Sequence, residues 1–309
     1  MVVITAPDDL HHPITLAATK NGKHVFCDKP LAMNAGQAEQ MVRAAQDAGV
    51  AHFTGFTWRY APPFATLHDL ITRGDLGQLQ GLDGHFRIGP PLPGKEWQLT
   101  PEQRSGGVFS NLAVHLLDLV RFLAGHTAEV SRGAGDTLRS WRVWATGNGD
   151  SDNSSRSTAV HQSSWIHLTF PSGSTTIHAR LQASQQVTLR ASDPVRIEVH
   201  GSQTSAIGYA NPLKPHLQRV DLIPQISAER EPLQTLLYPG GPPAPPTAQL
   251  PSGGLLRPTI RHLYEAHIVP RIVTGTHNPT TPTFHDGLLA QRLLDAALRS
   301  VVNGNWETP

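Results

Sequence analysis

The first group of residues that could do chemistry lies in the segment 22–30 (GKHVFCDKP). Residues 25–27 are apolar and predict a short strand, which Asp28, Lys29 and Pro30 follow directly. The amine of Lys29 would then lie at the carboxyl end of a strand, the edge at which ligands bind in open α/β sheets. Desolvation could lower the pKa of this amine there, or the amine could donate a hydrogen bond to a reacting group. Taken alone, the pattern also fits a solvated lysine in a turn.

The second group lies on a predicted helix over 108–123, which Gly125 ends. Asn111, His115 and Asp118 stand at positions i, i+4 and i+7, so they share one face of this helix. His115 could act as a general base near neutral pH, and Asp118 could fix the orientation of its ring. The alternative is a polar seam whose members hydrogen-bond one another. A zinc site is disfavoured, because asparagine is a poor zinc ligand.

The elements that must position the first group alternate between strand and helix. Apolar residues predict strands at 2–5, 25–27 and 50–54. A helix is expected to begin near Pro13, and another to follow Asn34 as its N-cap. This order requires crossover connections, so it predicts a parallel sheet.

The pattern changes after a predicted helix over 63–73. Strand-like segments then follow without helices between them, at 79–88, 159–170, 174–183 and 186–200. They predict a mostly antiparallel sheet, with a hairpin turn at Gly173. A last helix is predicted over 286–302, with Asp286 as its cap.

The composition excludes several classes of protein. The chain has 309 residues, enough for one large domain or two, and its 25 basic and 24 acidic side chains nearly balance. This balance gives no reason to expect nucleic acid or a membrane surface as partner. The single cysteine, Cys27, excludes an internal disulfide and fits a reducing compartment. No apolar run reaches the roughly 18 residues of a membrane span, and no signal peptide is recognisable. We therefore expect a soluble, cytoplasmic protein.

Together, the motifs of the chain resemble those of the Gfo/Idh/MocA oxidoreductases. In chain order they are 6–11 (APDDLH), 22–30, 55–62 (GFTWRYAP), 74–77 (GDLG), 106–118 and the tail 283–300. Each motif is only moderately specific, but the shared order and spacing are a strong signal. The resemblance covers residues 1–125 closely and the remainder loosely.

The resemblance implies a partial doubly wound (Rossmann) parallel sheet in residues 1–78. A C-terminal substrate and oligomerisation domain, 79–309, would follow with a large, mostly antiparallel open sheet. The final helix, 286–302, would pack back on the first domain. The family usually builds a homodimer or homotetramer through the C-terminal sheet, so we expect the same of this chain.

The resemblance further implies an NAD- or NADP-dependent dehydrogenase or reductase that acts on a sugar, inositol or related polyol. Lys29 would hydrogen-bond the reacting oxygen, and His115 would relay its proton. The implied cofactor-binding residues are Ala6, Pro7, His11, Asp28, Lys29 and Arg59. The implied substrate-binding residues are Trp58, Trp97, Asn111 and His115. For Arg59, packing against the sheet edge is the alternative, and no metal is implied.

Two residues depart from the family pattern. Asp28 replaces the usual glutamate before the lysine, and this shorter acid should be tolerated. Asn111 replaces the common aspartate four residues before the histidine. Because asparagine cannot accept a proton, the proton role shifts to His115 and Lys29.

The larger departure concerns the cofactor's phosphates. The Gly-x-Gly-x-x-Gly turn that holds a pyrophosphate on a helix N-terminus is absent from this sequence. The chain starts at what would be the fourth strand, which suggests that roughly 60–70 residues precede it in a full-length form. Strand 2–5 would then form an exposed edge. We therefore expect an N-terminally truncated dehydrogenase. The alternatives are a non-catalytic fragment or pseudoenzyme that serves as an oligomerisation partner, and an NAD-dependent glycosidase.

Overall fold

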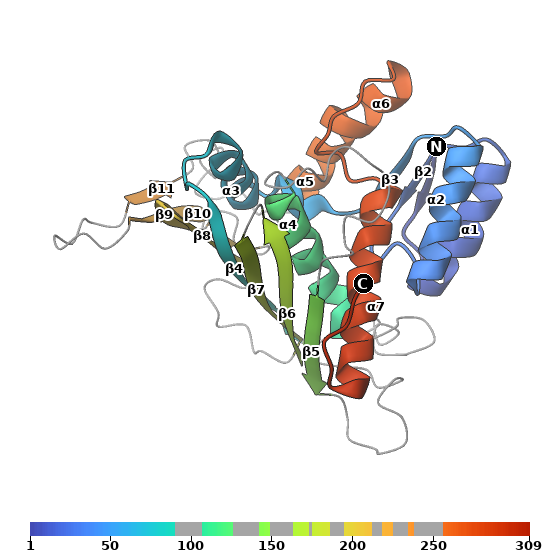
Figure 1. The fold of residues 1–309 in the computed structure, drawn as a ribbon. Helices are drawn as coiled ribbons and strands as arrows, with labels where there is room; N and C mark the ends of the chain where they lie inside the picture. Colours follow the sequence, from blue (N-terminus) through green and yellow to red (C-terminus); the bar gives the residue numbers. More distant parts are fainter. Residues whose placement is uncertain are drawn as a thin grey trace.

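In the computed structural model, the chain forms a small sheet and a large sheet with helices between and around them (Figure 1). The structure describes residues 1–89, 107–125, 142–148, 163–172, 175–185, 195–211, 218–224, 234–237 and 256–309. Trp97, Gly173 and the predicted strand residues 159–162 and 186–194 lie outside these ranges.

The small sheet contains three parallel strands in the order β1-β2-β3. They are β1 (Val2–Ile4), β2 (Val25–Cys27) and β3 (His52–Thr54). Helices α1 (Asp8–Lys20) and α2 (Ala35–Asp47) connect them. All of β2 is buried, because β2 lies between the other two strands. The predicted parallel sheet with helical crossovers is confirmed.

Helix α1 begins earlier than the sequence predicts. It starts at Asp8, directly after Pro7, and Pro13 lies inside it. Asp8 and Asp9 occupy the first turn, where acidic groups interact favourably with the helix dipole. The predicted start near Pro13 was wrong because it took proline, which suits a first helical position, as the first residue of the helix and left the acidic pair outside it.

The predicted cap of helix α2 is present. The side chain of Asn34 accepts a hydrogen bond from the backbone N–H of Gln37 at 2.9 Å. An asparagine in this position satisfies one of the N–H groups that the first turn of a helix leaves without a partner.

Strand β1 is an edge of the small sheet. Among the described strands it pairs with β2 alone, and Val3 is 50% exposed. The exposed apolar edge expected for residues 2–5 is therefore present in the described part of the molecule.

The large sheet has eight strands in the order β11-β10-β9-β8-β4-β7-β6-β5. Their bounds are β4 (Leu79–Arg87), β5 (Arg142–Asn148), β6 (Ser163–Ser172), β7 (Thr175–Ser184), β8 (Val195–Gly201), β9 (Thr204–Ala210), β10 (Arg219–Pro224) and β11 (Gln234–Leu237). Strands β4 and β7 are parallel, and every other neighbouring pair is antiparallel. The predicted mostly antiparallel sheet is confirmed, although β5 and β9 to β11 were not predicted.

Strand β9 shows why some strands escaped prediction. Its buried side carries Ala206, Gly208 and Ala210 in place of large apolar residues. Helix α3 (Pro62–Arg73) packs closely there, and a Cβ atom on Gly208 would lie 3.0 Å from Leu67 Cδ1. The small residues make room for the helix, so the strand lacks the alternation of large apolar residues that predicts strands.

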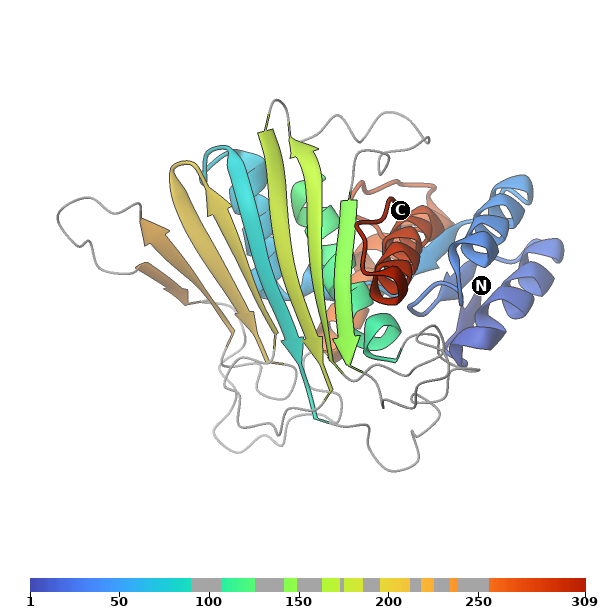
Figure 2. The same ribbon diagram turned by 60° about the horizontal axis from the view of Figure 1, so that its bottom comes forward.

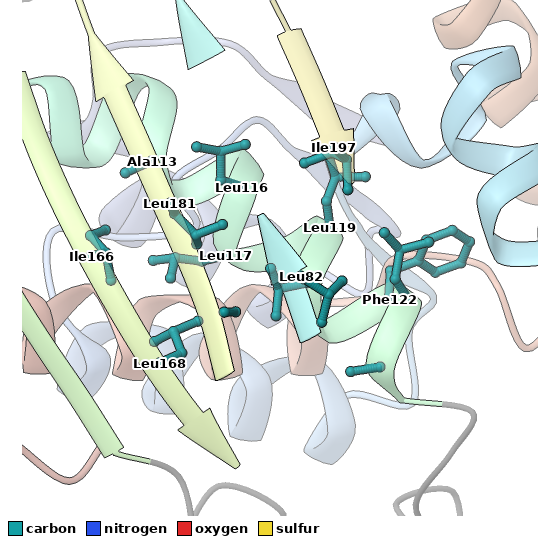
Figure 3. Packing of buried hydrophobic residues seen from close by; sticks show 14 of the residues in the cluster. Leu82, Ala113, Leu116, Leu117, Leu119, Phe122, Ile166, Leu168, Leu181 and Ile197 are labelled. Atoms are coloured by element: carbon teal, nitrogen blue, oxygen red, sulfur yellow. The ribbon is translucent and has the colours of Figure 1, made fainter. Parts of the chain in front are cut away.

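The hydrophobic core lies between the large sheet and the helices on one of its faces, with the strands in front and the helices behind them in Figure 2. Leu82, Leu168 and Leu181 of the sheet belong to the same buried cluster as Leu117 and Phe122 of helix α4 (Val114–Ala124) (Figure 3). Helix α3 matches its prediction to within one residue. The predicted helix 108–123 exists, but its start, η3 (Phe109–Ala113), is a π-helix.

Helix α7 (Phe284–Asn303) lies between the two sheets (Figure 1). It contacts α2 and β3 on one side and β5 on the other. The backbone N–H of Ala35 donates to Asp295 Oδ2 at 2.7 Å. A Cβ atom on Gly287 would lie 2.8 Å from both Leu31 Cδ2 and Thr54 Oγ1, so the absence of a side chain permits this close approach.

The cap of α7 differs from the prediction. Thr283, not Asp286, is the N-cap, and Asp286 is the third helical residue of a capping box. The carboxylate of Asp286 accepts a hydrogen bond from the backbone N–H of Thr283 at 2.9 Å.

Short helices complete the described chain: η1 (Thr57–Tyr60), α5 (Leu256–His262), η5 (Leu263–Ile268) and α6 (Val269–Val273). Within the described ranges, no helix combines the length and the apolar character that crossing a membrane requires.

Candidate active site

The carboxyl ends of β1 and β2 lie side by side and place Lys29. The backbone N–H of Asp28 donates to the carbonyl of Ile4 at 2.9 Å, and the N–H of Gly55 donates to the carbonyl of Cys27 at 2.9 Å. The chain then turns through a cis peptide bond between Lys29 and Pro30. Lys29 therefore stands at the sheet edge where its position in the sequence predicts it.

The carboxylate of Asp28 stabilises this turn through a hydrogen bond to its backbone. Its Oδ1 accepts a hydrogen bond from the backbone N–H of Lys29 at 2.8 Å. A Cβ atom on Gly55 would lie 2.5 Å from the same oxygen, so this approach requires glycine. The predicted cofactor residue Asp28 thus holds the backbone of the neighbouring lysine.

The amine of Lys29 reaches the C-terminal half of the chain. Its Nζ donates to the backbone carbonyl of Asn111 at 2.8 Å and lies 3.2 Å from the Oδ1 of the same residue. Asn111 lies in the π-helical turn η3, and such turns occur frequently at functional sites. The structure therefore brings together the two candidate groups of the sequence, the one with Lys29 and the one with Asn111 and His115.

His115 follows Asn111 one turn later, in α4, and is 8% exposed. Two aromatic rings lie against its imidazole. The ring centroid of Trp58 is 6.3 Å away at 69°, and that of Phe86 is 5.9 Å away at 35°. Trp58 is itself buried and also packs against Phe64, so the structure places this predicted substrate residue beside His115.

Asp118 does not orient His115 as expected. Its Oδ2 accepts from Arg59 Nε at 2.8 Å, and its Oδ1 accepts from Arg59 Nη2. The expectation failed because a buried arginine from another part of the chain takes both carboxylate oxygens. Arg59 is 3% exposed, so the structure places this predicted cofactor residue in a buried ion cluster.

The cluster contains two further residues that the sequence analysis did not connect with it. Arg59 Nη2 also donates to Asp286 Oδ1 at 2.8 Å, and Arg121 Nη1 lies 3.7 Å from the same oxygen. Burial by itself raises the pKa of Asp286, but the charges of Arg59 and Arg121 hold it well below its usual range. In the sequence, the only indication of this cluster is that charged residues of both signs stand in or close to the family motifs.

The segment after β1 supplies the remaining predicted residues. Pro7 is the N-cap of α1, and Ala6 precedes it. His11 is buried in the first half of α1, and its ring nitrogens contact the carbonyl oxygens of Ala6 and Pro30. Trp97 lies outside the described residues. Within the described part of the chain, no group of three or more His, Cys, Asp or Glu side chains is arranged to hold a metal ion.

The arrangement brings two proton-handling groups to one place. Lys29 has an amine and His115 an imidazole, and the peptide and side chain of Asn111 link the lysine to the helix that carries the histidine. A lysine and a histidine that bracket a small ligand can hold and move the proton of a hydroxyl group.

Comparison with known proteins agrees with this architecture. Residues 1–56 match the family model described as "Oxidoreductase family, NAD-binding Rossmann fold". Residues 64–207 match the GFO/IDH/MocA C-terminal domain.

Two curated relatives illustrate the similarity. A levoglucosan dehydrogenase of Pseudarthrobacter phenanthrenivorans is 28% identical over 134 residues, which cover 42% of this chain and 34% of the relative. A myo-inositol 2-dehydrogenase of Thermotoga maritima is 29% identical over 149 residues, 48% of this chain and 43% of the relative. The chain therefore spans less than half of the length of these relatives.

The fold is also found in a solved structure. A levoglucosan dehydrogenase in complex with NADH and levoglucosan has a TM-score of 0.77, with 21% sequence identity, over 100% of this chain and 80% of the other. The two family models match consecutive parts of the chain in the order in which the two sheets occur, and together they cover more than half of it. The chain belongs to the Gfo/Idh/MocA family of oxidoreductases.

Proposed function

We propose that this chain carries the substrate-side half of an NAD(P)-dependent dehydrogenase or reductase for a sugar, an inositol or a related polyol. The observation that carries the proposal is the contact between Lys29 Nζ and Asn111, which connects the strand-end lysine with the helix of His115. The named relatives, a levoglucosan and a myo-inositol dehydrogenase, support the substrate class.

The residues present fit the nicotinamide end of the cofactor. The backbone at Ala6-Pro7 and at Lys29-Pro30 forms the carboxyl ends of two adjacent parallel strands, joined by the hydrogen bond between Asp28 and Ile4. This is the position at which ligands bind in doubly wound sheets. When bound there, a nicotinamide supplies a hydride acceptor or donor. No Gly-x-Gly-x-x-Gly turn occurs in this sequence, so we assign no residue to the pyrophosphate.

Oxidation of an alcohol removes a hydride from carbon and a proton from oxygen, and leaves a carbonyl group. In the proposed site, Lys29 donates a hydrogen bond to the reacting oxygen and His115 receives its proton. Asn111 holds the lysine amine and cannot take the proton itself. Reduction runs through the same groups in reverse, with His115 returning the proton to the oxygen.

We further propose that copies of the chain associate through the large sheet. The face of this sheet opposite α3 and α4 carries no helix among the described elements (Figure 2). Trp165 on this sheet is 49% exposed, and exposed aromatic residues are typical of interfaces.

The hydride-transfer proposal is tested with NAD⁺, NADP⁺ and their reduced forms against a panel of inositols, pyranoses and anhydrosugars. The absorbance of the reduced nicotinamide is the readout. We expect Lys29→Met to lower turnover at least about 100-fold, since it removes the group that contacts the reacting oxygen. Lys20→Met, a matched change at an exposed lysine of α1, should leave turnover unchanged.

Equal activity of Lys29→Met and the parent chain would refute the role of Lys29. Absence of turnover with every pair of cofactor and substrate would instead favour the non-catalytic alternative for this chain. Cleavage of a glycoside without net change in nicotinamide absorbance would favour the NAD-dependent glycosidase.

A further inference from the structure

His11 joins the two backbone segments that the proposed function places at the nicotinamide. Its Nε2 lies 2.9 Å from the carbonyl oxygen of Ala6, after β1, and its Nδ1 lies 2.8 Å from the carbonyl oxygen of Pro30, after β2. The side chain is 1% exposed. Both ring nitrogens are therefore committed to backbone groups in the interior of the molecule.

Both partners of the His11 ring are hydrogen-bond acceptors. A carbonyl oxygen has no proton to donate, so each contact needs an N–H on the imidazole. The neutral ring has one N–H and the imidazolium has two. Only the protonated ring satisfies both contacts, and a charged donor makes each bond roughly twice as strong as a neutral one. In the neutral ring, one nitrogen lone pair would face a carbonyl lone pair.

Several titratable groups stand on the two elements around His11. They are Asp8, Asp9, His12 and Lys20 on α1 and Cys27, Asp28 and Lys29 at the end of β2. Asp8 stands three residues before His11 on α1 and is 1% exposed, so the two side chains are neighbours on the helix surface. Burial raises the pKa of the Cys27 thiol well above its usual value, so this neighbour adds no charge.

We propose that His11, in its protonated form, is a positioning residue that fixes the separation between the ends of β1 and β2 and thereby holds Lys29 against Asn111. Pro30 directly follows Lys29, so the carbonyl that His11 binds belongs to the same turn as the lysine. The relevance for catalysis rests on the proposed function, whereas the hydrogen-bond arrangement does not.

The direct test is NMR of the chain with isotope-labelled histidine side chains, in which the nitrogen shifts report protonation. The His11 signals are assigned by their loss in His11→Gln. Under the buffer conditions of the turnover assay, we expect both His11 nitrogens to carry protons, since each of them faces a carbonyl oxygen. A folded chain in which the His11 ring carries one N–H under these conditions would overturn the proposal.

A second measurement follows the strand ends themselves. The backbone N–H of Asp28 donates to the carbonyl of Ile4, so its hydrogen exchange reports whether the two ends stay together. We expect His11→Gln, which has no ionisable group, to speed this exchange at least tenfold. The matched control is His12→Gln, a change at the neighbouring histidine that contacts the exposed Gln40, and it should leave exchange unchanged.

Exchange at Asp28 that is equal in His11→Gln and the parent chain would also contradict the proposal. Neither measurement uses substrate or turnover. Their failure is therefore distinguishable from failure of the proposed hydride transfer.

Discussion

At the scale of single residues, the site is defined by an amine that is held by an amide. Lys29 Nζ donates to the backbone carbonyl of Asn111 and lies within hydrogen-bond distance of its side-chain oxygen. An amide oxygen orients the ammonium group without the full charge of a carboxylate. An aspartate in the same place would therefore attract the Lys29 amine more strongly than Asn111 does.

Replacing this amide by a carboxylate gives a prediction at the residue scale. In Asn111→Asp, a negative charge would stand at about the present 3.2 Å from Lys29 Nζ. A nearby opposite charge favours the ammonium form of an amine. The basic limb of the pH–rate profile should therefore move to higher pH, by about one pH unit. Asn21→Asp, an exposed change at the end of α1, serves as control. A limb that stays in place or moves to lower pH would contradict the prediction.

At the scale of elements, helix α7 packs between the small sheet and the large sheet and contacts both. Its first turn is held by the capping box of Thr283 and Asp286, and Asp286 also pairs with Arg59 of η1 and lies near Arg121 of α4. One carboxylate thus fixes the helix start and links three elements. At Gly287 the helix also lies close to Leu31 and to Thr54 of β3.

The prediction at this scale concerns Gly287→Ala. On an exposed helix this change would stabilise by about 1 kcal/mol, because alanine has the higher helix propensity. Here the new Cβ would lie 2.8 Å from Leu31 Cδ2 and Thr54 Oγ1, and overpacking typically costs 1–3 kcal/mol. We therefore expect a net loss of about 1 kcal/mol in the free energy of unfolding, measured by urea denaturation.

Gly36→Ala in α2 is the matched control, because the added Cβ would meet a single atom, Asn34 Oδ1, at 3.3 Å. Because Gly36 is exposed, the change should be neutral or should stabilise by up to about 1 kcal/mol. A Gly287→Ala variant that is more stable than the parent chain would show that α7 does not pack as described.

At the scale of the whole molecule, the segment before α7 lies along β3, where the N–H of Thr54 donates to the carbonyl of Pro282. Two histidines lie here, the half-buried His52 and the buried His267. The N–H of Phe284 donates to His52 Nδ1 at 3.1 Å, and His267 Nδ1 contacts Thr281 Oγ1 at 2.9 Å. Burial, with Arg271 as the next cause, lowers the pKa of His52 to about 4. Burial, with His262 as the next cause, likewise lowers the pKa of His267 to about 4.

These shifts predict an acid-sensitive fold. Both pKa values are lower in the folded chain than the value of about 6.5 in the unfolded chain, so the unfolded chain binds more protons below that pH. The stabilisation is fully present above about pH 6.5 and is lost as the pH falls toward 4. Between pH 7 and pH 5 the free energy of unfolding should drop by on the order of 2 kcal/mol per histidine.

The measurement is the urea midpoint as a function of pH. His52→Asn keeps a hydrogen-bond acceptor for Phe284 and does not titrate, so it should make this dependence shallower. His12→Asn, at a half-buried position on the surface of α1 next to Gln40, should not change it. A parent chain with equal stability at pH 7 and pH 5 would refute the prediction.

Much of the fold and part of the site could be predicted from local patterns. Apolar residues at 25–27 and the residues Asp28 and Lys29 after them predict a strand end with an amine, and the structure has both. Cap residues and helical periodicity also predicted α2 and α3 closely. These features depend on neighbours in the sequence, so the sequence by itself determines them.

Only the tertiary structure decided which polar groups meet. Helical spacing put Asp118 on the face of His115, but Arg59, buried 59 positions away in the chain, takes its carboxylate. The π-helical turn at Asn111 and the two carbonyl partners of His11 were likewise not visible in any local pattern. A buried charge or donor must find a partner wherever the fold brings one, because leaving it unpaired costs several kcal/mol. The sequence therefore determined the elements and the chemical groups, and the packing of the two sheets around α7 decided how those groups are paired.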